Sequence, residues 1–308
     1  MAPPRGNTTG INGRGFGRRS LLAGAASSAA VVALGATTAC SRVSSAAENS
    51  GGDLLERLRA QGTVRLGIAG EQPYSYIDKN GELTGSSPAI ARVIFKRLGV
   101  AHVQPLPTEF NSLIAGLNSQ QFDVIAAGMY ITPVRCDQVL FADPEYEMRD
   151  SFIVPRGNPK NLHDYADIKK TGARMATGVG YAEIDYAKDV GIKEGDMMLL
   201  QDQLAGRLAV EQGRADVFAG TAVTVRNVVQ QADNKKTEYT QPFAGTLHGK
   251  KDLGTGAFAF RKGQSKLRDA FNAELHKMKK SGELLRLMRP FGFLEGEMTT
   301  MTAKERCA

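Results

Sequence analysis

Short apolar runs typical of strands alternate with amphipathic helical patterns twice along this chain, and this repeated alternation limits the possible folds more than any other feature. In the first unit we expect strands at residues 63–70, 103–106 and 122–128, with helices at 87–99 and 110–119 between them. A β-α-β-α-β order predicts a parallel sheet with right-handed crossover connections.

A second unit repeats the pattern between residues 151 and 231, with strands expected at 151–154, 173–177, 198–200 and 215–219. The chain then returns to the first unit, where we expect a further strand, a helix at 265–280 and a last helix ended by Pro290. Two crossings between two α/β units predict a two-lobed α/β fold with a hinged cleft. We assign residues 53–150 and 243–308 to lobe 1 and residues 151–242 to lobe 2.

The first 39 residues are typical of an export signal. A basic start leads to Arg18 and Arg19, then to a small-residue apolar stretch and to Thr37-Thr38-Ala39-Cys40. This order resembles a twin-arginine signal followed by a lipobox, with Thr37 where Leu is favoured. We expect removal of residues 1–39, lipidation of Cys40 and a flexible tether at 40–52. The protein would then be exported and anchored on the outer face of the cytoplasmic membrane, facing the periplasm if an outer membrane is present; an ordinary signal peptide cut nearby is the alternative.

Charge and cysteine content exclude several functional classes. The formal net charge of the whole chain is +7, and residues 1–39 contain four arginines and no other charged residue, so the exported chain has a net charge of +3. Basic residues are mixed with acidic ones and form no basic aromatic strip, so we expect no nucleic-acid partner. The three cysteines have no metal-ligand spacing, so we expect no metal and no cofactor. Cys136 and Cys307 are expected to be free thiols, since a disulfide would need Cα atoms within about 7 Å.

A candidate anion site follows the strand that begins at Phe122. Thr132 and Pro133 are typical of a helix start, with Thr as N-cap and Pro at the first helical position. Arg135 lies in that first turn, where a cation opposes the helix dipole and is poor for stability. A guanidinium beside free helix N–H groups is well suited to a carboxylate. The alternative is a surface arginine paired with Asp137 or Glu109.

The sequence TPVR (residues 132–135) followed by VLFADPEY (139–146) resembles the signature of family 3 of the solute-binding proteins of ABC importers. The resemblance covers residues 53–293 and implies the type II periplasmic-binding-protein fold. It also implies that Thr132 and Arg135 clamp a ligand carboxylate. The segments GEQPYSY, TEF, AAGMYITPVRC and RPFGF resemble the ectoine- and hydroxyectoine-binding members of that family.

The ends of the predicted strands carry the other candidate ligand contacts, because open α/β sheets bind ligands there. The resemblance to the ectoine binders puts Glu71, Tyr74, Phe110 and Tyr130 at binding positions beside Arg135. Three aromatic rings could enclose a delocalised cation, and Glu71 could accept its N–H groups. The alternatives are core packing for Tyr74 and Phe110 and a solvated loop position for Glu71. Gly128 belongs to the same predicted strand end.

In lobe 2 the candidates are Gly180, Tyr181, Glu183 and Thr221. Gly180 and Tyr181 would offer backbone N–H groups, and Glu183 is either a helix cap or a second cation contact. Amino-acid binders of the family usually carry an Asp at the place of Thr221, where it pairs with the α-ammonium. Since a buried ammonium without a carboxylate partner is costly, the Thr disfavours an ordinary α-amino acid.

We therefore expect a non-enzymatic, monomeric binding protein that delivers ectoine or hydroxyectoine to an ABC permease. The alternative within the class is a polar amino acid or a betaine as ligand. A dehydratase-type enzyme on the same fold is the alternative from another class. It is disfavoured because the four histidines fall outside the segments named above and no nucleophile–base pair is visible.

Overall fold

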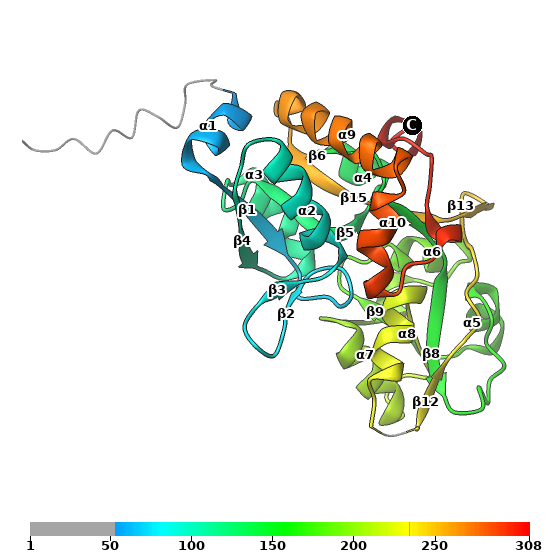
Figure 1. The fold of residues 1–308 in the computed structure, drawn as a ribbon. Helices are drawn as coiled ribbons and strands as arrows, with labels where there is room; N and C mark the ends of the chain where they lie inside the picture. The colour runs from blue at the N-terminus through cyan, green and yellow to red at the C-terminus, as the bar shows by residue number, and fades with distance from the viewer. Residues whose placement is uncertain (1–52, 234) are drawn as a thin grey trace, which may run out of the picture. The chain divides into compact units, whose positions relative to one another are not determined.

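The computed structural model describes residues 53–233 and 235–308 (Figure 1). The expected signal, Cys40 and tether lie outside the described residues. No helix in the described part of the chain is long and apolar enough to cross a membrane.

The first sheet has the strand order β4-β1-β5-β15-β6, with β7 also paired to β15. Strand β1 lies between β4 and β5 and runs parallel to both, as the sequence predicts. Strand β15 is antiparallel to β5, β6 and β7, so the sheet as a whole is mixed. Its strands are β1 (Thr63–Ile68), β4 (His102–Pro107), β5 (Val124–Tyr130), β6 (Val139–Phe141), β7 (Tyr146–Met148) and β15 (Gly254–Arg261).

Helices cover both faces of this sheet, and β5 shows why. Val124 and Ala126 join the core under α2, α9 and α10, whereas Ile125 and Ala127 join the core under α3. Successive strand residues point to opposite faces, so a strand that is apolar at every position must be covered on both. Figure 1 shows α2, α9 and α10 grouped together. The helices of this unit are α1 (Leu54–Gln61), α2 (Ser86–Arg97), η2 (Phe110–Ser112), α3 (Leu113–Asn118), α4 (Pro133–Cys136), α9 (Ser265–Lys280), α10 (Glu283–Met288) and η4 (Arg289–Phe291).

The second sheet has the order β10-β9-β11-β8-β12. Strands β10, β9 and β11 are parallel, and β8 and β12 are antiparallel to their neighbours. Its strands are β8 (Asp150–Pro155), β9 (Met175–Gly178), β10 (Met198–Leu200), β11 (Val217–Thr221) and β12 (Thr237–Tyr239). Its helices are α5 (Tyr165–Thr171), α6 (Glu183–Asp189), η3 (Glu194–Asp196), α7 (Gln203–Glu211) and α8 (Ala222–Gln230). The expected α/β class is confirmed.

The two segments that connect the sheets lie side by side. Asp150 and Phe243 exchange both backbone hydrogen bonds, each at 2.9 Å. The boundaries expected between residues 150 and 151 and between 242 and 243 fall next to this pair. The division into lobes at these residues, and a hinge between them, stay predictions.

Several short elements complete the described part of the fold. They are β2 (Tyr76–Ile77) with β3 (Leu83–Thr84), β13 (Gly245–Leu247) with β14 (Lys250–Asp252), η5 (Glu295–Glu297) and α11 (Ala303–Arg306). Strands β2 and β3 pair in antiparallel, with Tyr76 opposite Thr84.

A disulfide joins Cys136 and Cys307, so the expectation of free thiols is wrong. Their Cα atoms are 5.7 Å apart although 171 residues separate them in sequence. The backbone N–H of Ala303 donates to Asp143 at 2.9 Å, which brings α11 against the first sheet and Cys307 next to α4. This long-range placement of a one-turn helix could not be read from the spacing of the two cysteines.

Candidate functional site

A small pocket, partly open to solvent, lies between residues of the two sheets. Nine of the eleven side chains or glycines expected at the site line it, and Ala182 is an additional lining residue. The lining residues are Glu71, Tyr74, Phe110, Gly128, Tyr130, Arg135, Tyr181, Ala182, Glu183 and Thr221. Thr132 and Gly180 do not line it. That any of these residues contacts a ligand stays a prediction.

Arg135 is fixed by contacts with both units. Its guanidinium donates to the backbone oxygen of Tyr130 at 2.6 Å and to that of Gly180 at 2.7 Å. Its Cζ also lies 5.5 Å from the centre of the Phe110 ring, within cation–π range. Burial lowers the pKa of Arg135, but a guanidinium remains charged at neutral pH. Two of its five N–H donors are used in these bonds, so donors remain for an anion.

Thr132 caps α4, as the sequence predicts. Its hydroxyl accepts from the backbone N–H of Arg135 at 3.4 Å, and Pro133 takes the first helical position. Thr132 is not among the residues that line the pocket, and it lines a larger neighbouring cavity instead. The cap therefore explains Thr132 structurally, and its place in a carboxylate clamp stays a prediction.

Tyr181 differs from the expectation that its backbone N–H is a free donor. The N–H of Tyr181 donates to the Gly178 oxygen at 3.1 Å, because the chain turns tightly into α6. Tyr181 lines the pocket with its side chain instead. Gly180 contributes its carbonyl, which accepts from Arg135.

The aromatic rings around the pocket pack in two groups. Tyr74 is 2% exposed and stacks on Tyr146 at 5.5 Å, and its hydroxyl donates to Thr221 at 3.1 Å from the other sheet. Phe110 meets Tyr181 edge-on at 5.2 Å. Tyr74 thus packs in the core and also lines the pocket, so the two sequence interpretations of this residue are compatible.

Gly128 allows the Tyr74 ring to reach its position. Its φ is +61°, and a Cβ there would lie 2.5 Å from Cδ1 of Tyr74. Its carbonyl accepts from the Tyr146 hydroxyl at 2.9 Å. A side chain at this position would displace Tyr74 and strain the backbone.

Two carboxyl groups lie in the pocket wall. Glu71 is 6% exposed, and burial, followed by the nearby Glu183, raises its pKa to about 8. Burial raises the pKa of Glu183 to about 7, and Arg135 opposes this rise. A ligand cation placed against these groups would lower both pKa values again. Glu71 is therefore not a solvated loop carboxylate.

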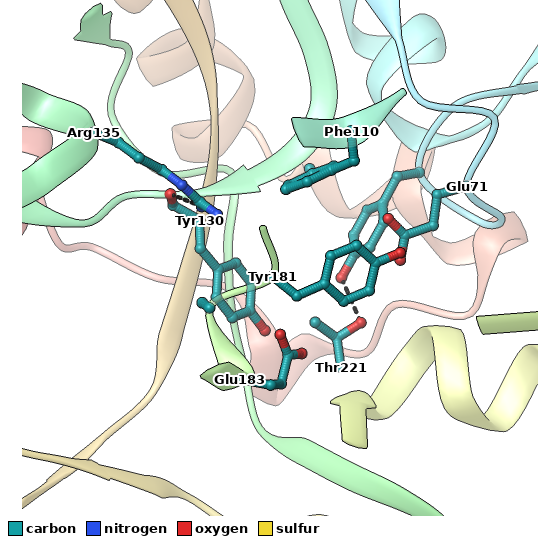
Figure 2. Close-up of a pocket in the computed structure, with 10 residues that line it drawn as sticks. Glu71, Phe110, Tyr130, Arg135, Tyr181, Glu183 and Thr221 are labelled. Carbon is teal, nitrogen blue, oxygen red and sulfur yellow. Dashed lines mark hydrogen bonds between the residues drawn. The ribbon is translucent and has the colours of Figure 1, made fainter. Parts of the chain in front are cut away.

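Unpartnered polar atoms collect near Glu183. Among the described residues, Oε1 of Glu183, the Tyr130 hydroxyl and Oδ1 of Asp150 are buried without a hydrogen-bond partner. Figure 2 shows the Tyr130 hydroxyl directed toward the Glu183 carboxylate. Buried polar atoms without partners are costly, so this side of the pocket is suited to a polar ligand group.

The pocket therefore offers a fixed cation, two carboxyl groups and aromatic faces within one small volume. No histidine lines it. Within residues 53–233 and 235–308, no cluster of three potential metal ligands occurs. Sequence reasoning missed Asp150 and Tyr146. Asp150 is the last residue assigned to the first stretch of lobe 1, and nothing in its neighbours marks it. Tyr146 ends the segment VLFADPEY and could have been proposed from it.

Comparisons with known proteins agree with this arrangement. The profile of the family described as bacterial extracellular solute-binding proteins, family 3, matches residues 64–293. A probable amino-acid ABC transporter periplasmic-binding protein, y4tE of Sinorhizobium fredii, is 34% identical over 85% of this chain and 88% of its own length.

Two solved structures share the fold. EhuB in complex with hydroxyectoine is 32% identical, with a TM-score of 0.75 over 82% of this chain and 97% of that one. The ancestral amino acid-binding protein AncCDT-1, a precursor of cyclohexadienyl dehydratase, is 26% identical, with a TM-score of 0.66 over 77% of this chain and 99% of that one.

Proposed function

This chain belongs to family 3 of the bacterial extracellular solute-binding proteins, and we propose that it captures ectoine or hydroxyectoine and delivers the solute to an ABC permease. Its fold is the type II periplasmic-binding-protein fold of its structural neighbours. Most of the similar proteins are transport binding proteins rather than enzymes. The residues that line the pocket support this choice of solute.

Arg135 supplies the anion end of the proposed site. Its guanidinium is held by the Tyr130 and Gly180 carbonyls, which come from the two sides of the pocket. A ligand carboxylate that uses the remaining donors would gain a charge-assisted, two-point contact without reordering the side chain. This clamp would use Arg135 together with Thr132.

Glu71 supplies the cation end. Ectoine carries a cyclic amidinium, which is flat, delocalised and able to donate N–H bonds. Tyr74, Phe110 and Tyr130 line the same pocket as Glu71, so one ligand ring could contact aromatic faces and a carboxylate together. Glu183 is a second acceptor for the amidinium or for a ligand hydroxyl, since its Oε1 has no partner among the described residues.

The observation that carries the proposal over an α-amino acid is the environment of Thr221. Its hydroxyl accepts from Tyr74 and contacts the Thr224 hydroxyl at 2.8 Å. In amino-acid binders of the family, an Asp at the position of Thr221 usually pairs with the ligand's α-ammonium. Because this chain has a threonine there, a compact ammonium would have to pair with Glu71 or Glu183. A polar amino acid or a betaine remains the second candidate, because y4tE is named as a probable amino-acid binding protein.

Contacts that join the two sheets across the pocket favour capture by closure. Besides the bonds of Tyr74 and Arg135, Gln203 donates to the Gln72 carbonyl at 3.3 Å. Closed lobes would exclude water and strengthen the charged contacts inside. We further propose that the protein is exported through its twin-arginine-like signal, anchored through Cys40 and active as a monomer.

Titration calorimetry of protein stripped of ligand by unfolding and refolding tests this proposal. The panel is ectoine, hydroxyectoine, glycine betaine, proline, glutamine and arginine. Tight binding of the two ectoines alone is the expected result. Tight binding of a common amino acid would contradict the ligand assignment and leave only the family. Dehydratase turnover of a cyclohexadienyl substrate by the same preparation would contradict the expectation that the protein is not an enzyme.

A further inference from the structure

The helix that carries Arg135 has little support of its own. Helix α4 is only four residues long, and Val134 in its middle is 69% exposed. A single turn is unstable in isolation, because few hydrogen bonds offset the cost of ordering it. Its last residue, Cys136, is joined to Cys307 by the disulfide. The position of Arg135 therefore depends on what holds Cys307.

Helix α11 holds Cys307 through contacts at both of its ends. At its start, Thr302 and Glu305 exchange hydrogen bonds as a capping box, and Ala303 is bonded to Asp143. At its end, Arg306 donates to Asp252 through two nitrogens at 2.6 and 3.0 Å. These two side chains are only 15% and 16% exposed, so the pair is stronger than an ordinary surface ion pair.

Asp252 extends this chain of contacts to the other wall of the pocket. Its Oδ2 also accepts from the Tyr186 hydroxyl at 2.8 Å. Tyr186 lies on α6, which begins with Glu183. A covalent bond and three hydrogen bonds thus connect the helix of Arg135 with the helix of Glu183, on opposite sides of the pocket.

We propose that the segment Thr302 to Cys307 is a positioning clasp: its disulfide holds Arg135, its Arg306–Asp252–Tyr186 contacts hold the helix of Glu183, and solute affinity depends on both. This inference rests on the proposed function, because it takes Arg135 and Glu183 as ligand contacts. The physical basis is preorganisation, since side chains already fixed in the binding geometry lose less entropy when the ligand binds. A disulfide would persist in an exported protein, where the surroundings are oxidising.

The test compares the full chain, purified without reductant, with the double variant Cys136→Ser/Cys307→Ser. Each is titrated with ectoine before and after treatment with a water-soluble phosphine. The phosphine gives two electrons to the disulfide, two protons from water yield two thiols, and the phosphine takes the water oxygen. We expect reduction to weaken ectoine binding by the oxidised protein about tenfold. The double variant should bind at the weakened level with or without the phosphine.

Unchanged affinity after reduction, with both thiols verified by mass spectrometry, would overturn the proposal. A matched control separates positioning from general stability. Arg174→Ala removes the two-nitrogen ion pair with Asp216, which lies away from the pocket, and should lower Tm without changing the ectoine Kd. If affinity falls with Tm in Arg174→Ala to the same degree as in the double variant, the clasp affects only stability. That result would contradict the proposed positioning of Arg135 and Glu183.

Amide hydrogen exchange without ligand makes the test independent of the solute. Exchange in residues 131–136 and 183–189 should become faster after reduction. Asp252→Asn should accelerate exchange in 183–189 and, to a smaller extent through the loosened end of α11, in 131–136. Faster exchange in a protein that binds no ectoine would support the clasp and reject the proposed solute. Tight ectoine binding with unchanged exchange and affinity after reduction would reject the clasp and leave the proposed function intact.

Discussion

At the level of single residues, Arg135 shows how a position that is poor for stability can be useful for binding. It stands in the first turn of α4, where a cation opposes the helix dipole. Its guanidinium is nevertheless ordered by two carbonyls and lies over Phe110. The arrangement lowers fold stability but orients a cation. A cation at such an unfavourable helix position indicated from the sequence that Arg135 binds an anion.

Replacing Arg135 with alanine should therefore weaken ectoine binding severely. The loss of a buried, charge-assisted contact costs about 2–5 kcal/mol, or about 30-fold or more in Kd. Calorimetry measures the change, and circular dichroism verifies that the variant is folded. Affinity equal to that of the unmodified protein would remove Arg135 from the site.

Replacing Glu71 with glutamine should discriminate between ligands. An amidinium donates N–H bonds to the carboxylate, whereas a quaternary ammonium has no N–H to donate. We expect a loss of about 1.5–3 kcal/mol for ectoine and a smaller loss for glycine betaine, titrated at high concentration. Losses of the same size for both ligands would contradict the role given to Glu71.

At the level of elements, the sequence predicted most strands and helices, but it did not predict the residues at which the strands that reach the pocket end. The apolar run expected to finish at Gly128 continues as β5 to Tyr130. Gly128 is passed in a left-handed conformation that the periodicity of the run does not reveal. The extra two residues carry the Tyr130 ring and carbonyl to the pocket and to Arg135.

Gly128→Ala tests whether this local geometry shapes the pocket. The new Cβ would lie 2.5 Å from the Tyr74 ring, so Tyr74 or β5 must move. We expect ectoine affinity to fall at least about tenfold and Tm to fall as well, since backbone strain of this kind costs about 1–3 kcal/mol. Gly81→Ala, also at positive φ but with open space around it, is the matched control and should keep its affinity. Equal affinities in the two variants would show that Tyr74 is not constrained by Gly128.

The short elements α4 and α11 mark the limit of sequence reasoning at this scale. The cap at Thr132 was predicted correctly, but not that the helix ends after one turn. The disulfide between α4 and α11 depends on packing between segments 171 residues apart, which no local pattern encodes.

At the level of the whole molecule, the pocket is assembled from five chain segments, and their identity could be predicted because strand ends converge in this fold. The direction of each side chain could not be predicted from the sequence. Thr132 faces a neighbouring cavity, and Tyr181 presents its ring rather than its amide. These directions follow from how α4 and α6 pack, which only the folded chain determines.

Stability should also depend on pH through Glu145, which lies outside the pocket. It is fully buried, neither carboxyl oxygen has a hydrogen-bond partner among the described residues, and burial raises its pKa from about 4.5 to about 8. Between these values the folded state binds more protons than the unfolded state, so the free energy of unfolding falls as pH rises.

Glu145→Gln should remove this contribution. We expect the variant to gain at least about 1 kcal/mol, or about 2–4 °C in Tm, relative to the unmodified protein when pH is raised from 5 to 8. Thermal unfolding at both pH values measures the difference, and ectoine affinity should stay constant. A constant difference in Tm between the two proteins across this range would mean that Glu145 is ionised in the folded state.

The crystal structure of the protein with ectoine tests the central claim most directly. The account predicts the ligand carboxylate within hydrogen-bond distance of the Arg135 guanidinium, with the amidinium N–H groups on Glu71 and the ring against Tyr74, Phe110 and Tyr130. A ligand whose carboxylate lies away from Arg135, or whose amidinium does not meet Glu71, would contradict it.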